Sequence, residues 1–271
     1  MSSRIHSTAV VDPTAELAEG VEIGPGAVVG PGVRIGEGTR IGAGAQIEGP
    51  TILGAENRVY PHACIGFDPQ DLKFAGEETR LEVGCRNTFR EFCTVHRGTG
   101  KGGGLTTVGD DNLFMVYTHV AHDCHVGSRT VFSNGGTLAG HVVVDDDAVI
   151  GAYSAVHQFC RVGRHAYIGG YSKIVQDPLP YAKSVGDKAS YYGMNRIGLE
   201  RKGMDAESLG RVERALRILV RGPRRLEEAL ELVATELGGH PEVDYLVEFV
   251  RGSERGVIRN LPLRRGRAQS G

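Results

Sequence analysis

Large apolar side chains return at every sixth position along most of this chain, and that rhythm is the dominant signal in the sequence. One uninterrupted series runs from Ile5 to Ile65, and a second runs from Val108 to Ile174. The periods of ordinary helices and strands, 3.6 and 2 residues, would not keep such a register for so long. A hexapeptide period is typical of a parallel β-helix, in which each short strand buries its apolar residue by stacking on the neighbouring turns. The first series predicts scaffold and subunit contacts.

The other positions of the hexad agree with a narrow coil. Glycine often follows the aliphatic residue, as in "IGPGAV" and "IGEGTR", where the chain must turn sharply. The fifth position is usually small, and Cys93, Cys124 and Cys160 fall on it, so we interpret these cysteines as interior filler. The strings resemble those of the bacterial hexapeptide-repeat transferases. That resemblance implies a left-handed coil with eighteen residues per turn, whereas parallel crossovers in general are right-handed.

Two polar segments interrupt the hexads. Residues 67–80 and 98–107 are predicted to be inserted loops, which in a solenoid lie on one face and commonly form the binding face. The second loop is rich in glycine but lacks the G-x-x-x-x-G-K-[ST] order of a phosphate loop, and no helix is expected after it. We interpret it as a mobile loop that lets substrates pass.

The hexads stop after Pro180, and the composition changes. Residues 189–271 carry fifteen Lys and Arg against twelve Asp and Glu, a net charge of +3, which leaves −5 for residues 1–188. We predict a helix capped by Asp205, with an apolar side and an opposite side that carries Arg211, Arg214, Arg217 and Arg221. Further helices are expected over 225–237 and after Pro241, and the tail from Asn260 is expected to be disordered.

The fold class is therefore mainly β. We predict a left-handed parallel β-helix over residues 1–188 with two inserted loops, and a C-terminal helical domain over 189–271. The arginine side of its first helix is a candidate docking surface for an acidic carrier protein.

Composition excludes several classes of function. A formal net charge of −2 gives no support for nucleic acid as a partner. Five cysteines without a C-x-x-C pair fit a reducing compartment. The sequence shows neither a signal peptide nor a long apolar run, so we expect a cytoplasmic protein without stable membrane insertion.

Histidines gather in one window, and the coil period groups them further. "THVAHDCHVG" contains His119, His122 and His125. Residues eighteen apart occupy the same place on successive turns, about 4.8 Å from each other. This step takes His122 to Gly140 and then to Gln158, and it takes Asp123 to His141.

This grouping predicts a general base beside a bare backbone amide. His122 can accept a hydroxyl proton near neutral pH, and Asp123 can orient its imidazole. Gly140 leaves room for a thioester, and its N–H can stabilise the oxyanion of a tetrahedral intermediate. Because no serine or cysteine lies convincingly beside His122 as a nucleophile, we expect direct transfer rather than a covalent intermediate.

Several short motifs make the resemblance specific. "QDLK", "HRGT", "GGGLT", "AHDC", "LAGHV" and "AVHQFC" resemble the UDP-N-acetylglucosamine 3-O-acyltransferase family, which acts first in lipid A synthesis of Gram-negative bacteria, and the similarity covers nearly the whole chain. It implies transfer of an (R)-3-hydroxyacyl chain from the phosphopantetheine of acyl carrier protein to the 3-hydroxyl of UDP-N-acetylglucosamine. It also implies a homotrimer with sites between subunits, and neither a cofactor nor a metal.

The resemblance also assigns roles to residues. It places the base on His122, supported by Asp123, and the oxyanion donor on Gly140. The sugar nucleotide and pocket positions that it implies are Gln70, Asp71, Lys73, His119, His141, His157 and Gln158. Asn195 and Arg201 match positions that contact the nucleotide and the donor, and Gly170 matches the position that limits acyl length. Lys188 and Ile197 depart from the residues that relatives often carry there.

Other interpretations remain open from the sequence. The same base would serve an amino-sugar acceptor and form an amide. A zinc enzyme similar to the γ-class carbonic anhydrases would use His119, His122 and His141 as imidazole ligands. A purely structural coil would leave the histidine cluster and the two loops without a role.

Overall fold

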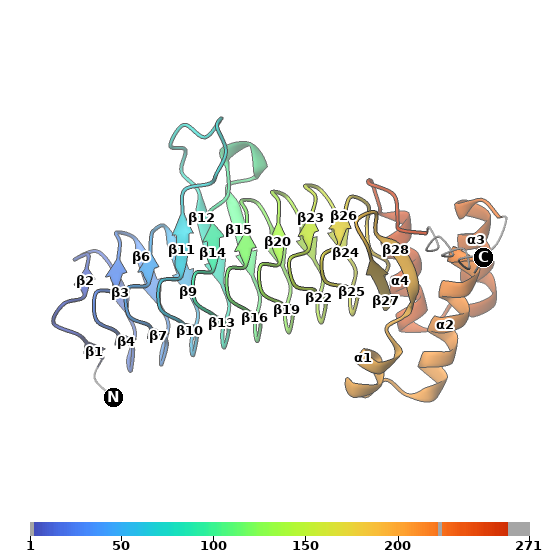
Figure 1. Cartoon of the computed structure of the whole chain (residues 1–271), viewed down its shortest axis with the longest axis horizontal. Coiled ribbons are helices and arrows are strands. Elements are labelled where there is room, and N and C mark those ends of the chain that lie inside the picture. The colour runs from blue at the N-terminus through green and yellow to red at the C-terminus, as the bar shows by residue number, and fades with distance from the viewer. Residues whose placement is uncertain (1–2, 222–223, 260–271) are drawn as a thin grey trace, which may run out of the picture.

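The hexads form a coil of short parallel strands whose three faces are three sheets, followed by helices at one end (Figure 1). The computed structural model describes residues 3–221 and 224–259. The first sheet contains β1 (Arg4–Ile5), β4 (Glu22–Ile23), β7 (Arg40–Ile41), β10 (Arg58–Val59), β13 (Thr88–Phe89), β16 (Leu113–Phe114), β19 (Val131–Phe132), β22 (Val149–Ile150), β25 (Tyr167–Ile168), β27 (Ala182–Val185) and β28 (Ser190–Met194).

The second and third sheets complete each turn. The second contains β2 (Val10–Val11), β5 (Val28–Val29), β8 (Gln46–Ile47), β11 (Cys64–Phe67), β14 (Thr94–His96), β17 (His119–Val120), β20 (Thr137–Leu138), β23 (Ala155–Val156) and β26 (Lys173–Ile174). The third contains β3 (Glu16–Leu17), β6 (Val33–Ile35), β9 (Thr51–Leu53), β12 (Arg80–Val83), β15 (Leu105–Val108), β18 (His125–Val126), β21 (Val143–Val144) and β24 (Arg161–Val162).

The register confirms the predicted period of eighteen residues. Ile5 pairs with Ile23 on the next turn, and His119 pairs with Thr137. Every apolar residue of the second series is at most 3% exposed, and Cys93, Cys124 and Cys160 are buried among them. At the start of the coil Ile5 is 49% exposed, because no earlier turn covers it. The hexad positions therefore form one continuous core along the axis of the coil.

The two predicted loops leave the coil at neighbouring turns and project together from one side (Figure 1). The first connects β11 to β12, and the second connects β14 to β15. Between them Val83, Phe89 and Val95 keep the interior filled, and all three are buried. The second loop contains a short 3-10 helix, η1 (Gly100–Gly102).

The chain turns at the three edges of the prism with residues in the left-handed region. Many of these residues are not glycine, and each lies beside another residue of positive φ on a neighbouring turn. We name the edges by their residues. The aromatic edge, between the first and second sheets, carries His62, Phe92, Tyr117, Tyr153 and Tyr171. The histidine edge, between the second and third sheets, carries Asp123, His141 and Phe159, and the charged edge carries Arg86, Asp111, Arg129 and Asp147.

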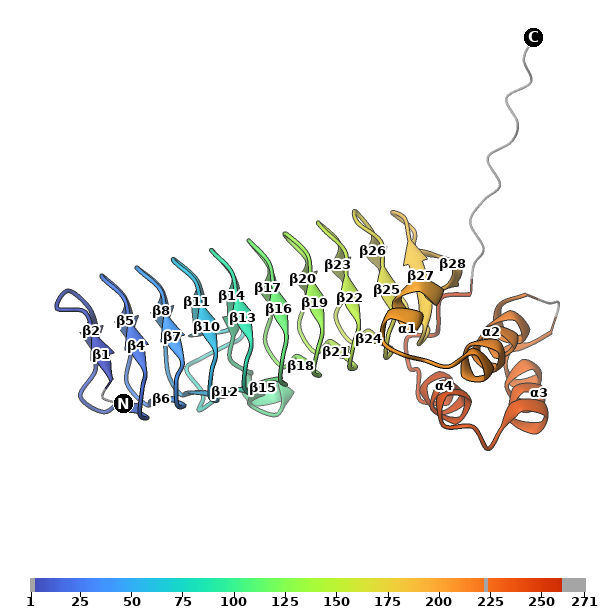
Figure 2. The same cartoon turned by 90° about the horizontal axis from the view of Figure 1, so that it is seen from below.

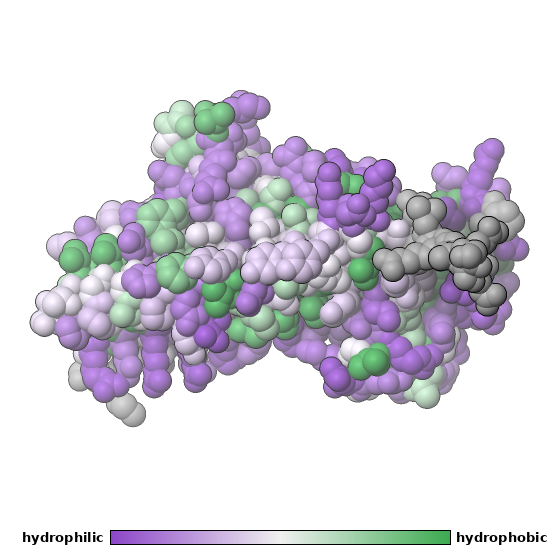
Figure 3. All heavy atoms as spheres, viewed as in Figure 1, coloured by the Kyte–Doolittle hydropathy of each residue, from purple (hydrophilic) through white to green (hydrophobic). Residues whose placement is uncertain are grey.

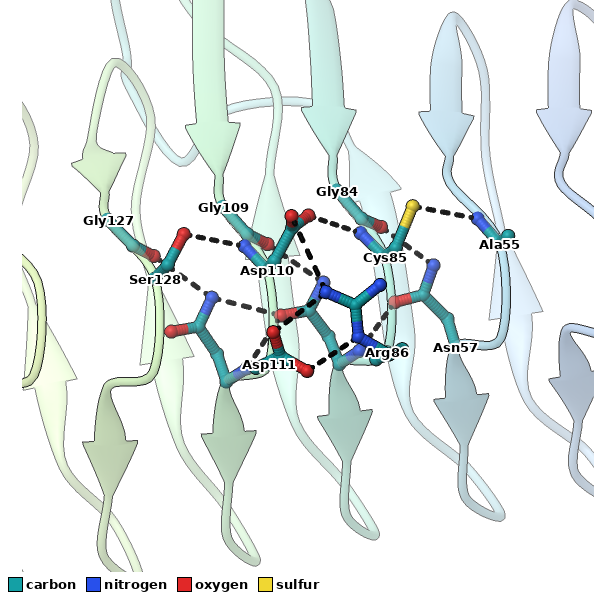
Figure 4. A network of polar contacts seen from close by, with 12 residues as sticks. Ala55, Asn57, Gly84, Cys85, Arg86, Gly109, Asp110, Asp111, Gly127 and Ser128 are labelled. Carbon is teal, nitrogen blue, oxygen red and sulfur yellow. Dashed lines mark hydrogen bonds and ion pairs between the residues drawn. The ribbon is translucent and has the colours of Figure 1, made fainter.

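A ladder of buried asparagines runs inside the charged edge and is drawn from close by in Figure 4. The Asn57 side chain accepts from the Asn87 N–H at 2.9 Å, and Asn87 in turn accepts from the Asn112 N–H and Nδ2. Each amide group also donates to turn carbonyls, such as Gly84 O and Gly109 O. The ladder thus satisfies backbone groups that the turns would leave without partners.

We expect Asn87→Leu to destabilise the coil. The change leaves the buried Asn112 N–H and the carbonyl of Gly109 without partners, which costs about 1–3 kcal/mol for each group. The unfolding midpoint in urea should fall markedly. Thr130→Val is the matched comparison, because the Thr130 N–H still donates to Asn112 and only one hydroxyl is lost. Equal losses in the two variants would contradict this account of the ladder.

The C-terminal region closes the end of the coil (Figure 2). Strand β28 turns back antiparallel to β27, and the helices that follow within the described residues are α1 (Arg196–Arg201), α2 (Ala206–Val220), α3 (Leu226–Leu237) and α4 (Pro241–Arg251). Asp205 caps α2 by accepting from the Ser208 N–H, as predicted, and α3 and α4 lie where the sequence places them. Helix α1 and the β27–β28 hairpin were not predicted.

The division expected at residue 188 falls inside that hairpin. A second core already includes Leu179, Tyr181 and Ala182, and it continues through α2, α3 and α4. The tail from Asn260, which we expected to be disordered, lies outside the described residues. Within residues 3–221 and 224–259, none of the helices combines the length and apolar character that a membrane crossing requires.

Candidate active site

His122 and Asp123 form a hydrogen-bonded pair on the histidine edge. The His122 Nδ1 lies 2.7 Å from the Asp123 Oδ2, and the two side chains are 16% and 1% exposed. A carboxylate only accepts hydrogen bonds, so in the neutral imidazole Nδ1 carries the hydrogen and the lone pair is on Nε2. The His122 Nε2 can therefore act as a base, and the hydrogen bond to Asp123 fixes the orientation of the imidazole ring.

The second loop holds Asp123 from the other side. The Thr99 N–H donates to Oδ1 at 2.8 Å, and the Thr99 hydroxyl donates to Oδ2 at 2.7 Å. The Asp123 N–H donates to the Thr106 Oγ1 at 2.8 Å. Both ends of the loop thus hold a residue of the site, and sequence reasoning missed Thr99 and Thr106.

Gly140 lies directly against the His122 ring, as the step of eighteen residues predicts. A Cβ at Gly140 would lie 2.5 Å from the His122 Cε1 and 2.8 Å from Nε2. The turn is continuous with the one before it, because the His141 N–H donates to His122 O at 3.0 Å. Among the described residues the Gly140 N–H donates to no acceptor. Only glycine fits this position with the imidazole in place.

His141 completes the group around Asp123. Its ring is perpendicular to that of His122 at a centroid distance of 5.2 Å, and its Nε2 lies 3.7 Å from the Asp123 Oδ2. The Phe159 ring stacks on the His141 ring at a centroid distance of 4.7 Å. Ligand atoms of His122, Asp123 and His141 all lie within 4.8 Å of one another, a spacing that could hold a metal ion. The zinc interpretation of the sequence named His119, which is not part of that group.

His119 and His96 lie next to this pair in a drier environment. Burial, with a smaller effect of the His96 and His122 rings, lowers the pKa of His119 to about 4. Burial likewise lowers the pKa of His96, whose ring meets that of His119 at 5.2 Å. The His119 Nδ1 lies 2.7 Å from the Thr94 hydroxyl. Both histidines are therefore neutral at pH 7, and His96 is 6% exposed.

We expect acid to destabilise the protein partly through His119. Its folded pKa lies below the ordinary value of 6.5, so the unfolded chain binds the proton more tightly between those two values. Its contribution is complete above pH 6.5 and is lost as the pH falls toward 4. Melting temperatures measured from pH 7 to pH 4.5 should fall less steeply for His119→Gln than for the wild type. Parallel curves would contradict this assignment.

The remaining predicted residues lie in four places: the first loop, the histidine edge, the aromatic edge and the helical region. Gln70 and Lys73 are exposed on the first loop, and Asp71 is half-buried there and accepts from the Lys73 N–H. Within the described part of the chain none of the three makes a hydrogen bond or ion pair with the histidines. Hydrophobic residues are among those at the outer end of this projection (Figure 3), and Leu72 is fully exposed.

Two further predicted pocket residues continue the histidine edge. His157 and Gln158 lie exposed on the turn after Gly140. Gly170 lies on the aromatic edge instead, beside Ala152. The residues near the helical region are Asn195, whose side chain donates to His165 O at 3.1 Å, and Arg201, which is exposed at the end of α1.

Comparisons with known proteins agree with this architecture. Residues 177–258 match the family described as Udp N-acetylglucosamine O-acyltransferase, Domain 2, and residues 2–36 match the bacterial transferase hexapeptide repeats. The acyl-[acyl-carrier-protein]--UDP-N-acetylglucosamine O-acyltransferase of Stenotrophomonas maltophilia is 48% identical over 94% of this chain and 98% of its own length. The enzyme of the same name from Myxococcus xanthus is 49% identical over 95% of this chain and 100% of its own.

Solved structures give the same result. The UDP-N-acetylglucosamine acyltransferase of Francisella novicida superimposes with a TM-score of 0.91 at 36% identity, over 94% of each chain. The UDP-N-acetylglucosamine O-acyltransferase of Moraxella catarrhalis has a TM-score of 0.91 at 39% identity and covers 94% of this chain and 99% of its own. Similarity of this extent in sequence and fold leads to one conclusion: the chain belongs to the UDP-N-acetylglucosamine O-acyltransferase family.

Proposed function

We propose that this protein transfers an acyl chain from acyl carrier protein to the 3-hydroxyl of UDP-N-acetylglucosamine, the first step of lipid A synthesis. The observation that carries the proposal is the His122–Asp123 pair lying over Gly140, within a chain that matches acyltransferases along nearly its whole length. An (R)-3-hydroxyacyl chain is the donor that the sequence motifs imply.

The geometry supports direct transfer. The His122 Nε2 takes the proton from the sugar hydroxyl while that oxygen attacks the thioester carbonyl carbon. The Gly140 N–H donates to the oxyanion of the tetrahedral intermediate. When the C–S bond breaks, the proton on Nε2 passes to the departing thiol of the phosphopantetheine. Asp123 stabilises the imidazolium throughout.

Neither cysteine near the site is suited to covalent catalysis. Cys124 follows Asp123 in sequence, but it points into the core, and burial raises the pKa of its thiol to about 12. It is therefore a thiol and a poor nucleophile at neutral pH. Cys93 is also fully buried, and burial raises the pKa of its thiol. These surroundings favour direct attack by the sugar oxygen.

A product assay tests the proposed reaction. The purified enzyme is offered UDP-N-acetylglucosamine and its 3-amino analogue, each with 3-hydroxyacyl chains of several lengths on acyl carrier protein. We expect mass spectrometry to detect an ester of the first nucleotide, formed at full rate in the presence of a metal chelator. Exclusive formation of an amide would contradict the oxygen acceptor, and loss of activity in chelator would favour the zinc alternative.

We propose that the site is completed by a second copy of the chain in a homotrimer. His122 and Gly170 lie on different edges of one prism, so one chain alone does not bring the base and the acyl-length residue together. The stacked rings of the aromatic edge, with Tyr117 61% and Tyr171 74% exposed, supply an apolar surface for that contact. Sedimentation equilibrium should give three times the mass of the chain.

The helical region supports docking of an acidic carrier protein. The apolar side of α2 is buried, and its arginines lie on the other side. Arg211 pairs with Glu207 at 2.9 Å and Arg214 pairs with Glu236, whereas Arg217 and Arg221 form no ion pair within the described residues. Those two exposed guanidinium groups are available to acidic side chains of the donor. Such a donor, together with five free cysteines, supports the cytoplasm as the location.

Gly170→Met should shorten the preferred acyl chain. A Cβ at Gly170 meets only the backbone of Ala152, with its oxygen at 3.3 Å, so a longer side chain has room to extend over the aromatic edge. There it would occupy space that the end of a long acyl chain needs. Relative kcat/KM values for donors differing by two methylenes should shift by at least tenfold toward the shorter donor. An unchanged order of donors would contradict the role of Gly170.

A further inference from the structure

The backbone of the second inserted loop packs closely against the carboxylate of Asp123. Thr99 caps η1 by accepting from the Gly102 N–H at 3.1 Å, and the same hydroxyl donates to the Asp123 Oδ2 at 2.7 Å. A Cβ at Gly102 would lie 2.1 Å from the Asp123 Cγ, and one at Gly98 would lie 2.8 Å from Oδ1. The glycines of this loop therefore allow a close contact with the carboxylate, which is 1% exposed.

Within residues 3–221 and 224–259, the hydrogen bonds to the carboxylate come from Thr99 and His122. Oδ1 accepts from the Thr99 N–H, and Oδ2 accepts from the Thr99 hydroxyl and the His122 Nδ1. Two donors on one residue fix both the position and the rotation of a carboxylate. The rotation decides whether an oxygen faces Nδ1, and that contact decides which ring nitrogen carries the proton.

We propose that Thr99 is a positioning residue for the acyl transfer: its hydroxyl and its N–H hold Asp123 so that His122 presents an unprotonated Nε2 to the sugar hydroxyl. The proposal rests on the proposed function of His122 as the base. The Thr99 side chain contacts the carboxylate of Asp123 and not the His122 ring nitrogens, so it acts through Asp123. The inserted loop is then a support for the catalytic pair.

Thr99→Val deletes the hydroxyl and keeps the shape of the side chain and the backbone N–H. We expect kcat to fall by about tenfold or more, the lower range for loss of a residue that orients a reacting group. The KM for UDP-N-acetylglucosamine should change by less than about threefold, because ground-state binding does not use this contact. Thr99→Ser keeps the hydroxyl and should retain most of the activity.

Thr107→Val is the matched control. The Thr107 hydroxyl lies 2.9 Å from the His125 Nδ1 on the outer surface of the third sheet, so it is also a threonine beside an imidazole, but it is outside the catalytic group. Its removal should leave kcat within about twofold of the wild type.

A double-mutant cycle and a spectroscopic signature separate positioning from a structural role. In an Asp123→Asn background, Thr99→Val should lower kcat by no more than about twofold, because the group through which it acts is already altered. The ¹⁵N chemical shifts of the His122 ring should show a larger fraction of the tautomer with hydrogen on Nε2 in Thr99→Val than in Thr99→Ser.

The outcomes distinguish this proposal from the proposed function. If the His122→Gln enzyme were active, His122 would not be the base, and Thr99 would have no catalytic group to position. An inactive His122→Gln enzyme together with an unaffected Thr99→Val enzyme would overturn the positioning role alone. Additive losses of kcat in the Asp123→Asn background would also overturn the positioning role. A Thr99→Val chain that does not fold would overturn it too, because the contact would then be needed for folding.

Discussion

A His122→Gln enzyme is expected to lose a factor of about 10² to 10⁴ in kcat, the usual contribution of a general base. Glutamine retains an amide that can donate to Asp123, so the neighbouring turn should keep its structure, but the side chain cannot accept the hydroxyl proton. Steady-state kinetics with UDP-N-acetylglucosamine should show the loss in kcat, while the affinity for the sugar nucleotide, measured by calorimetry, stays close to that of the wild type.

His125→Gln is the control for that result. His125 lies three residues away on the outer surface of the third sheet and is exposed, with the Thr107 hydroxyl as its partner. Its replacement should leave kcat nearly unchanged. A His122→Gln enzyme with more than about a tenth of wild-type kcat would show that another group takes the proton.

Gly140→Ala is expected to cost at least about tenfold in kcat without unfolding the coil. The added methyl group would lie 2.5 Å from the His122 Cε1, closer than side-chain atoms approach, so the imidazole must move away from the Gly140 amide. Base and oxyanion donor are then separated, and loss of one oxyanion donor alone costs about 10²–10³ in kcat where it has been measured. The crystal structure of the variant should show the displaced ring.

Gly210→Ala is the matched control for the added methyl group. Gly210 lies in α2, and apart from its own helix backbone and chain neighbours no described atom lies within 4 Å of the position of its Cβ. Alanine favours a helix interior over glycine by about 1 kcal/mol, so this variant should melt at a slightly higher temperature with unchanged kcat. A Gly140→Ala enzyme of normal activity, with His122 in its original position, would contradict the arrangement proposed for the site.

Much of the coil could be predicted because its interior repeats without variation. An apolar residue at a fixed step identifies each buried position, and a step of eighteen residues correctly placed Gly140 against His122 and His141 against Asp123. Left-handedness was implied by the resemblance, since no hexad residue encodes the direction in which the coil winds.

The loops limited what the period could predict. Thr99 and Asp123 are 24 residues apart, which is not a whole turn, because the second loop adds residues between them. The motif "HRGT" indicated a family, but no spacing rule connects its threonine to a carboxylate on the next turn. The β27–β28 hairpin and α1 were missed for a different reason: they begin where the hexads stop, and each is too short to show a periodicity of its own.

Stacked turns also make the coil lengthen in steps of one turn, since inserted loops project sideways and do not extend it (Figure 1). Insertion or removal of eighteen residues between the histidine edge and β27 would preserve the pairing of the turns, whereas insertion of a single residue inside a strand would move apolar side chains out of the interior. The span from His122 to α2 can thus be adjusted by about 4.8 Å at a time. The distance between the catalytic pair and the proposed docking surface for the carrier protein would then evolve by duplication or loss of complete turns.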